Sequence, residues 1–273
     1  MTPFFAGLRF LLLRRAGQIS VMALFAGGSF LGWTVLRGNL SSSVVLGKVH
    51  LSDPLAILQI FASGHSLSLR AVTGAIIVAS VFALIGGRSF CGWVCPLNIV
   101  TDGAAWLRRR LKIDSTVKTA ALPGQARYWV LGLSLLLSAL LGVAAFDWVS
   151  PIGMLHRGIL FGMGLGWTAV LGVFVFDLLV VKNGFCGHLC PLGGFYALIG
   201  RFGLLTVAHR RDRCSLCMRC TEICPECQVL NMIGREDRAV LSGECINCGR
   251  CIEACGSGAL RFAGRRGRQK GGD

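Results

Sequence analysis

Eight cysteines near the C-terminal end constrain this chain more than any other feature. They form two runs with the same spacing, Cys-x-x-Cys-x-x-Cys-x-x-x-Cys. The two runs comprise Cys214, Cys217, Cys220 and Cys224, and then Cys245, Cys248, Cys251 and Cys255. Three closely spaced thiolates can hold three corners of an iron–sulfur cube, and a fourth that is set further off can reach a second cube. The spacing therefore predicts two [4Fe–4S] clusters, each with ligands from both runs.

The fourth cysteine of each run is expected to bind the cluster of the other run, and this rule assigns the ligands of each cluster. The first cluster is predicted to use Cys214, Cys217, Cys220 and Cys255. The second is predicted to use Cys245, Cys248, Cys251 and Cys224. Structural zinc is the alternative, but zinc requires neither the third cysteine of a run nor the Pro225 that follows the first run. Gly256 replaces that proline in the second run, which affects the local turn and not the ligands. Cys227 fits neither run and is expected to be a packed thiol.

The composition of the chain indicates a membrane protein. Its mean hydropathy is +0.64, and the basic residues behind its net charge of +15 lie in blocks between long uncharged runs. That distribution follows the positive-inside rule and argues against nucleic acid as a partner. Four apolar runs each approach the roughly 20 residues that cross a bilayer: 19–36, 71–87, 128–146 and 159–181. Arg70 and Arg88 flank the second run and are expected to snorkel to the interface.

The distribution of Lys and Arg predicts the orientation. Three lie in 1–18, seven in 88–127 and fourteen in 182–273, against three in 37–70 and one in 147–158. Both termini and the cysteine runs should therefore face the cytoplasmic side of a bacterial inner membrane. The basic blocks are interpreted as topology determinants and lipid contacts. Between the first two apolar runs, Asp53-Pro54 predicts the start of a short helix along the outer surface.

An internal repeat completes the architecture. The segment Phe90-Cys91-Gly92-Trp93-Val94-Cys95-Pro96-Leu97 recurs 95 residues later as Phe185-Cys186-Gly187-His188-Leu189-Cys190-Pro191-Leu192. Each copy follows an apolar run, which predicts an all-α membrane domain of four transmembrane helices arranged two plus two. The predicted division is a membrane domain over 1–205, a small α+β two-cluster ferredoxin domain over 206–264 and a disordered basic tail over 265–273.

The twin CxxxCP motifs supply two further cysteine pairs, Cys91 with Cys95 and Cys186 with Cys190. Cysteines four apart on a helix share a face. The two pairs could hold a third iron–sulfur centre, act as a dithiol relay, or simply pack. The repeat argues against simple packing, and the first two alternatives stay open.

Together these motifs resemble a known family. The twin FCGxxCPL copies, the four apolar runs and the trailing two-cluster ferredoxin are similar to the NosR/NapH group. The stretch from Arg37 to Ser43, and the stretch from His50 to Leu58, resemble NapH within that group. The resemblance covers nearly the whole chain and implies a quinol dehydrogenase subunit rather than a stand-alone enzyme. It also implies electron transfer from membrane quinol to a NapG-like periplasmic ferredoxin, and through a c-type cytochrome to periplasmic nitrate reductase.

Quinol oxidation releases two protons, so a base near the quinol head group is expected. The main candidates are His50 and Asp53 on the predicted outer face, and Asp177 inside the fourth apolar run. Further ionisable candidates are His65, Asp147, His156 and His188. A structural role is the simpler interpretation of each histidine. For Asp177 the alternative is an internal ion pair, for example with Lys182.

Two other functions fit the same cysteines. The chain could be a maturation protein that reduces a metal centre or a disulfide of a partner enzyme, or a membrane anchor that uses its clusters structurally. Electron flow from cytoplasmic clusters to a periplasmic partner also needs a route across the membrane, and the apolar runs contain no histidine pairs for haem.

Overall fold

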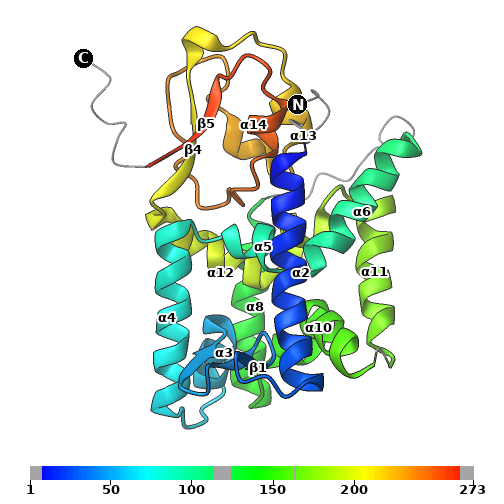
Figure 1. The fold of residues 1–273 in the computed structure, drawn as a ribbon, viewed down its shortest axis with the longest axis vertical. Coiled ribbons are helices and arrows are strands. Elements are labelled where there is room, and N and C mark those ends of the chain that lie inside the picture. The colour runs from blue at the N-terminus through cyan, green and yellow to red at the C-terminus, as the bar shows by residue number, and fades with distance from the viewer. Residues whose placement is uncertain (1–7, 114–123, 163, 265–273) are drawn as a thin grey trace. The chain divides into compact units, whose positions relative to one another are not determined.

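The computed structural model describes residues 8–113, 124–162 and 164–264, and most of them are helical (Figure 1). The predicted tail over 265–273 lies outside these residues. The longer helices are α2 (Arg9–Phe30), α3 (Pro54–Ala62), α4 (Leu69–Ile85), α6 (Leu97–Arg110), α8 (Ala126–Leu141), α10 (Pro151–Phe161), α11 (Gly166–Leu179) and α12 (Pro191–Ile199). The shorter ones are α5 (Ser89–Trp93), α9 (Ala145–Val149), α13 (Arg219–Ile223), α14 (Arg250–Ala254), the π-helix η1 (Phe185–Leu189) and the 3-10 helices η2 (Gly200–Phe202), η3 (Arg211–Arg213) and η4 (Cys227–Leu230).

The chain forms two compact units, each built from segments that are distant in sequence. One unit contains the chain up to Gly17, Val81–Val94 and the chain from Tyr196 onward, and we call it the ferredoxin unit. The other contains Gln18–Ser80 and Cys95–Phe195, and we call it the helical unit. The ferredoxin unit therefore includes the segment around Cys91, which the predicted division assigned to the membrane domain.

Four apolar helices correspond to the four predicted runs, but their lengths differ. By length and composition, α2 is the one helix among the described residues that could cross a membrane unaided. At about 1.5 Å per residue, its 22 residues reach about 33 Å, against a hydrocarbon core of about 30 Å. The other three, α4, α8 and α11, are apolar but shorter, with 17, 16 and 14 residues.

The bounds of two predicted runs were wrong. The first helix begins at Arg9 rather than at residue 19 and ends at Phe30, because Gly32 adopts a positive φ of 68° before an extended segment. The fourth run, 159–181, takes in the end of α10, which finishes at Phe161, and then all of α11. The backbone breaks between them at Gly162, where φ is 97° and a side chain would be strained.

These apolar helices leave many large apolar side chains exposed. On α8, Trp129 and Leu140 have exposed fractions of 79% and 72%. Further exposed residues lie on α2, α4 and α11: Leu12, Leu13, Ile19, Ile76, Val81, Leu84, Leu171 and Leu179. Large apolar side chains exposed in such number on the longer helices favour a lipid environment.

The segment between α2 and α4 contains a small sheet that the sequence did not predict. Strands β1 (Leu36–Gly38), β2 (Ser42–Val45) and β3 (Val49–Ser52) form an antiparallel meander in the order β1-β2-β3. The short helix predicted after Asp53-Pro54 is confirmed as α3. Asp53 caps it, because its carboxylate accepts from the backbone N–H of Leu55 at 3.1 Å.

Several arginines are buried, and this corrects two predictions made for basic residues. Arg88 does not snorkel: its exposed fraction is 1%, and it pairs with Glu226. Arg108 belongs to a basic block but is fully buried, and it donates to the carbonyl oxygens of Asp177 and Leu178 at the end of α11. A guanidinium can be buried when its donors meet carbonyl or carboxylate oxygens, which sequence spacing does not reveal.

The internal repeat extends beyond the cysteine motif. When 95 is added to its residue numbers, α4 corresponds to 164–180, which overlaps α11. In the same way, α5 corresponds to 184–188, which overlaps η1. Helices α6 and α12 follow the two motifs, with Pro96 at the N-cap of α6 and Pro191 as the first residue of α12. The two copies differ locally, since the first motif forms an α-helical turn and the second a π-helical turn.

In the ferredoxin unit, two antiparallel strands lie side by side (Figure 1): β4 (Leu205–His209) pairs with β5 (Leu260–Gly264). Its core is apolar and consists of Val207, Cys220, Val229, Leu230, Met232, Ile233, Val240, Cys251 and Leu260. Two of the predicted cluster ligands therefore belong to the core itself.

Candidate metal centres

The two cysteine runs fold into equivalent loops. The first loop has a positive φ at Leu216 (57°) and Met218 (56°), and the second at Asn247 (48°) and Gly249 (74°). These positions are 31 residues apart in both cases, as are the cysteines around them. Left-handed backbone costs a non-glycine residue roughly 1–2 kcal/mol. Successive N–H groups in such turns form a concave anion site of the kind found around iron–sulfur clusters. The N–H groups of these loops are therefore suited to surround thiolate sulfurs, which are anionic when they bind a metal.

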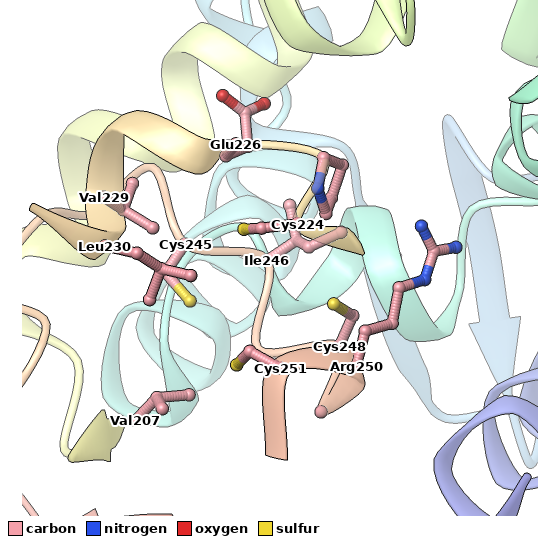
Figure 2. A pocket seen from close by; sticks show the side chains of 12 residues that line it. Val207, Cys224, Glu226, Val229, Leu230, Cys245, Ile246, Cys248, Arg250 and Cys251 are labelled. Carbon is pink, nitrogen blue, oxygen red and sulfur yellow. The ribbon is translucent and has the colours of Figure 1, made fainter. Parts of the chain in front are cut away.

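Each loop contributes to one of two cavities, and each cavity is lined by four cysteines. The first is lined by Cys214, Cys217, Cys220 and Cys255. The second is lined by Cys224, Cys245, Cys248 and Cys251, and Figure 2 shows their sulfurs around a common space. The structure therefore brings the fourth cysteine of each run to the three cysteines of the other run.

Each cavity presents four thiols, which is the donor set of one [4Fe–4S] cluster. A tetrahedral zinc site places each sulfur about 2.3 Å from the metal. Among the described residues, no group of three or more His, Cys, Asp or Glu side chains converges in a way that could hold one metal ion.

Burial changes the acidity of the thiols in the second cavity. It raises the pKa of Cys245 to about 12, and it also raises the pKa of Cys224 and of Cys251. Such thiols stay protonated in an apolar site unless a cation compensates the thiolate. Bound iron supplies that charge and deprotonates its ligands. The donor set of this cavity therefore fits a cationic metal group.

Two features close to these loops were considered in the sequence: the extra thiol of Cys227, and the residue that follows the fourth cysteine of each run. Cys227 is exposed, so the expected packing of this thiol was wrong; it opens the 3-10 helix η4 at the surface. The change from Pro225 to Gly256 after the fourth cysteine leaves both Cys224 and Cys255 extended, with ψ of 127° and 90°.

The CxxxCP cysteines are positioned by their own helical turns. Cys95 and Cys190 are buried, while Cys91 and Cys186 are half-buried. In the helical unit, the Cys190 sulfur accepts from the backbone N–H of Gly193 at 3.4 Å, at the start of α12. This contact positions Cys190 and does not identify what its sulfur binds.

The candidates for quinol contact are spread over several elements. His50 lies on β3, and Asp53 caps α3. Asp177 is fully buried on α11 and accepts from the backbone N–H of Phe185. His156 is buried on α10 with its ring edge-on to Phe25, their centroids 4.8 Å apart.

Of the remaining three candidates, Asp147 and His65 lie near hydroxyl groups. Asp147 accepts from the hydroxyl of Ser41 at 2.8 Å. His65 is exposed beside the Ser63 hydroxyl. His188 lies in η1. The described residues bring Asp53 near Asp147, and burial together with this neighbour raises the pKa of Asp53 to about 7.

Comparison with protein families supports this chemistry. A family described as "4Fe-4S binding domain" matches twice, over residues 67–114 and 160–209, so each match contains one CxxxCP copy. A family described as "4Fe-4S dicluster domain" matches residues 206–256, which contain both cysteine runs.

Individual relatives match over almost the whole chain. The "Ferredoxin-type protein NapH" of Haemophilus influenzae is 42% identical over 94% of this chain and 90% of its own length. The protein of the same name from Escherichia coli is 43% identical over 90% of this chain and 86% of its own length. The "Methylamine utilization ferredoxin-type protein MauN" of Methylorubrum extorquens is 44% identical over 89% and 85%.

The chain belongs to the NapH and MauN family of ferredoxin-type proteins. It is thus an iron–sulfur electron-transfer protein, as the 4Fe–4S family matches also indicate. Its identity to NapH and to MauN is nearly equal, so overall similarity does not separate the two branches. No solved structure matches the chain.

Proposed function

We propose that this chain is a membrane subunit that oxidises quinol and passes the electrons, one at a time, through two [4Fe–4S] clusters toward a partner ferredoxin. The observation that carries the proposal is the pair of four-cysteine cavities, each lined by cysteines of both runs. Cys214, Cys217, Cys220 and Cys255 would hold one cluster, and Cys224, Cys245, Cys248 and Cys251 the other. When bound, each cluster supplies a one-electron carrier. Two carriers match the two electrons that a quinol releases.

We propose further that α2, α4, α8 and the α10–α11 region form a four-span membrane domain, two plus two. The exposed apolar side chains on these helices and the double family match support this arrangement. The short helices, about 21 to 26 Å at 1.5 Å per residue, require thinning of the bilayer or snorkelling at their ends. By the positive-inside rule, both termini would face the cytoplasm.

The twin CxxxCP cysteines are proposed as a further redox site, as an iron–sulfur centre or as dithiols. The "4Fe-4S binding domain" match over both copies favours a centre. Iron and sulfide analysis of a variant with serine at Cys91, Cys95, Cys186 and Cys190 distinguishes the two. A centre lowers the iron content per chain, whereas dithiols leave it unchanged.

Quinol oxidation itself is tested by reduction kinetics. The purified chain is reconstituted in proteoliposomes and mixed with a quinol analogue in a stopped-flow instrument, and cluster bleaching is followed. Reduction within a turnover time supports the proposal. Clusters that stay oxidised with quinol, yet are reduced by dithionite, exclude quinol as the donor.

A second candidate follows from the MauN relatives, which are named for methylamine utilisation and are as similar as NapH. In that case the chain would deliver electrons for the maturation of a partner enzyme, by reducing a metal centre or a disulfide. Mixing the reduced protein with a NapG-like ferredoxin distinguishes the two candidates, because rapid reoxidation is expected for the nitrate reductase role alone.

A further inference from the structure

One buried ion pair lies beside the second cavity of the ferredoxin unit. Arg88 Nη1 is 2.6 Å from Glu226 Oε1, and the two side chains have exposed fractions of 1% and 4%. The same nitrogen donates to the backbone carbonyl of Glu244 at 2.9 Å. Glu226 follows Cys224 by two residues, and Glu244 directly precedes Cys245. One guanidinium therefore binds both chain segments that bring Cys224 and Cys245 to the cavity.

The partner of Arg88 belongs to the wall of this cavity. Glu226 lines it together with the four cysteines, and Figure 2 shows its carboxylate directed away from their sulfurs. Its second carboxylate oxygen accepts from Gln228 Nε2 at 2.6 Å. Charges interact several-fold more strongly at such a buried site than in water, because less solvent screens them. Both charges of the pair consequently act on whatever the cavity holds.

The helical turn that follows Arg88 contacts the same loop. On α5, the indole Nε1 of Trp93 donates to the carbonyl of Asn247 at 3.1 Å, between Cys245 and Cys248. Asn247 in turn donates to the Ser89 hydroxyl at 3.4 Å. The first CxxxCP segment thus holds the cysteine loop by its backbone as well as by charge.

Arg88 has no counterpart in the second copy of the repeat. Moved by 95 residues, its position is occupied by Asn183. The twin motifs share their cysteines, glycine and proline, but only the first carries a cation at this point. Arg88 is therefore particular to the first copy, and it contacts Glu226, which lines the second cavity.

We propose that Arg88 and Glu226 act as a pair of positioning residues that sets the reduction potential of the cluster in the second cavity. The pair would leave the potential of the first cluster unchanged. The inference rests on the proposed function in one respect, that the second cavity holds an iron–sulfur cluster; it does not depend on quinol.

Opposite charges predict shifts of opposite sign. Reduction adds negative charge to the cluster, so a nearby cation favours the reduced form and a nearby carboxylate disfavours it. Glu226→Gln removes the carboxylate and should raise the potential of one cluster, while Arg88→Met should lower it. A tenfold change in the reduction equilibrium, on the order expected for one buried charge, is about 59 mV for a one-electron couple. The double variant should return close to the wild-type value.

The test is a mediator titration of the full-length protein in detergent, followed by low-temperature electron paramagnetic resonance, with iron content measured on each sample. Glu236→Gln is the matched control. It removes a carboxylate of the same unit whose ion pair with Arg238 is largely exposed, and solvent screens such charges. Arg88→Lys keeps the charge and should stay near the wild-type potential.

Shifts of opposite sign at one cluster, with the control unchanged, support the pair. No shift in Glu226→Gln, shifts of the same sign, or equal shifts at both clusters overturn it. If Arg88→Met fails to load iron, Glu226→Gln and Arg88→Lys decide by the same criteria. A wild-type protein without any cluster signal refutes the proposed function instead, so the two failures are distinguishable.

Discussion

Asp177 accepts a hydrogen bond from the backbone N–H of Phe185, with 2.9 Å between its Oδ1 and the nitrogen. The carboxylate is fully buried on α11, and Phe185 begins the second CxxxCP motif. Arg108 donates a hydrogen bond to the backbone carbonyl of Leu178, the residue that follows Asp177 on α11. An acidic residue inside an apolar helix is a functional candidate by default. Here its contacts give it a positioning role, because it fixes where the π-helical turn starts.

Substitution at Asp177 should separate this role from quinol chemistry. Asp177→Ala leaves the part-buried N–H of Phe185 without its acceptor and should lower the free energy of unfolding by about 1–3 kcal/mol. Asp177→Asn keeps an acceptor oxygen and should have a smaller effect. Thermal denaturation in detergent measures both. If Asp177→Asn keeps its stability but loses quinol-driven cluster reduction, the carboxylate handles a quinol proton and the positioning role is insufficient.

Loss of one ligand should remove one cluster. Cys251→Ser replaces a core cysteine of the second cavity, and iron per chain should fall by about four atoms, the content of one cube. Cys227→Ser is the control, because this exposed thiol lies outside both cavities. Colorimetric iron and sulfide analysis gives the result. Equal loss of iron in the two variants would contradict the assignment of ligands.

The sequence predicted some features well and could not predict others. Cysteine spacing predicted which four sulfurs share a cavity, because the reach of a short loop around a cube is fixed by covalent geometry. Hydropathy located the apolar helices but missed the break at Gly162, since glycines at helix ends and within helices look alike in a hydropathy profile. The sheet over 36–52 was missed because its strands are only three or four residues long.

Long-range polar contacts were the least predictable part. Arg88 and Glu226 are 138 residues apart. In the sequence, nothing around either residue distinguishes it from an ordinary charged residue at the protein surface. The interpretation of Arg88 as a snorkelling residue followed from its place at the end of an apolar run. Only the folded structure shows that the end of this apolar run, with Arg88, belongs to the ferredoxin unit.

The pKa of Asp53 predicts how stability depends on pH. Burial raises this pKa from 3.8 to about 7, so folding favours the protonated carboxyl. The stability that this group contributes is fully present below about pH 4 and is lost as the pH rises through 7. Asp53→Asn keeps a good N-cap but cannot ionise. We therefore expect its melting temperature to match that of the wild type below about pH 4, to exceed it at pH 5 and to exceed it by more at pH 8. A difference in melting temperature that is the same at pH 5 and pH 8 would show that the pKa of Asp53 is not raised.

The two CxxxCP copies share a glycine, which is Gly92 in the first copy. A Cβ at Gly92 would lie 2.8 Å from the carbonyl oxygen of Ile246, closer than ordinary packing allows. Ile246 follows Cys245 directly, so any displacement moves a predicted ligand of the second cavity. Gly92→Ala should therefore lower the iron content or broaden the signal of one cluster while the first cavity stays loaded. Gly132→Ala is the matched control, because a Cβ there meets nothing within 4 Å and alanine favours a helix more than glycine does. Iron content and paramagnetic resonance of the two purified variants would decide. Identical spectra would mean that α5 and the cysteine loop can separate without disturbing the cluster, and the backbone contact between them would then have no role in holding it.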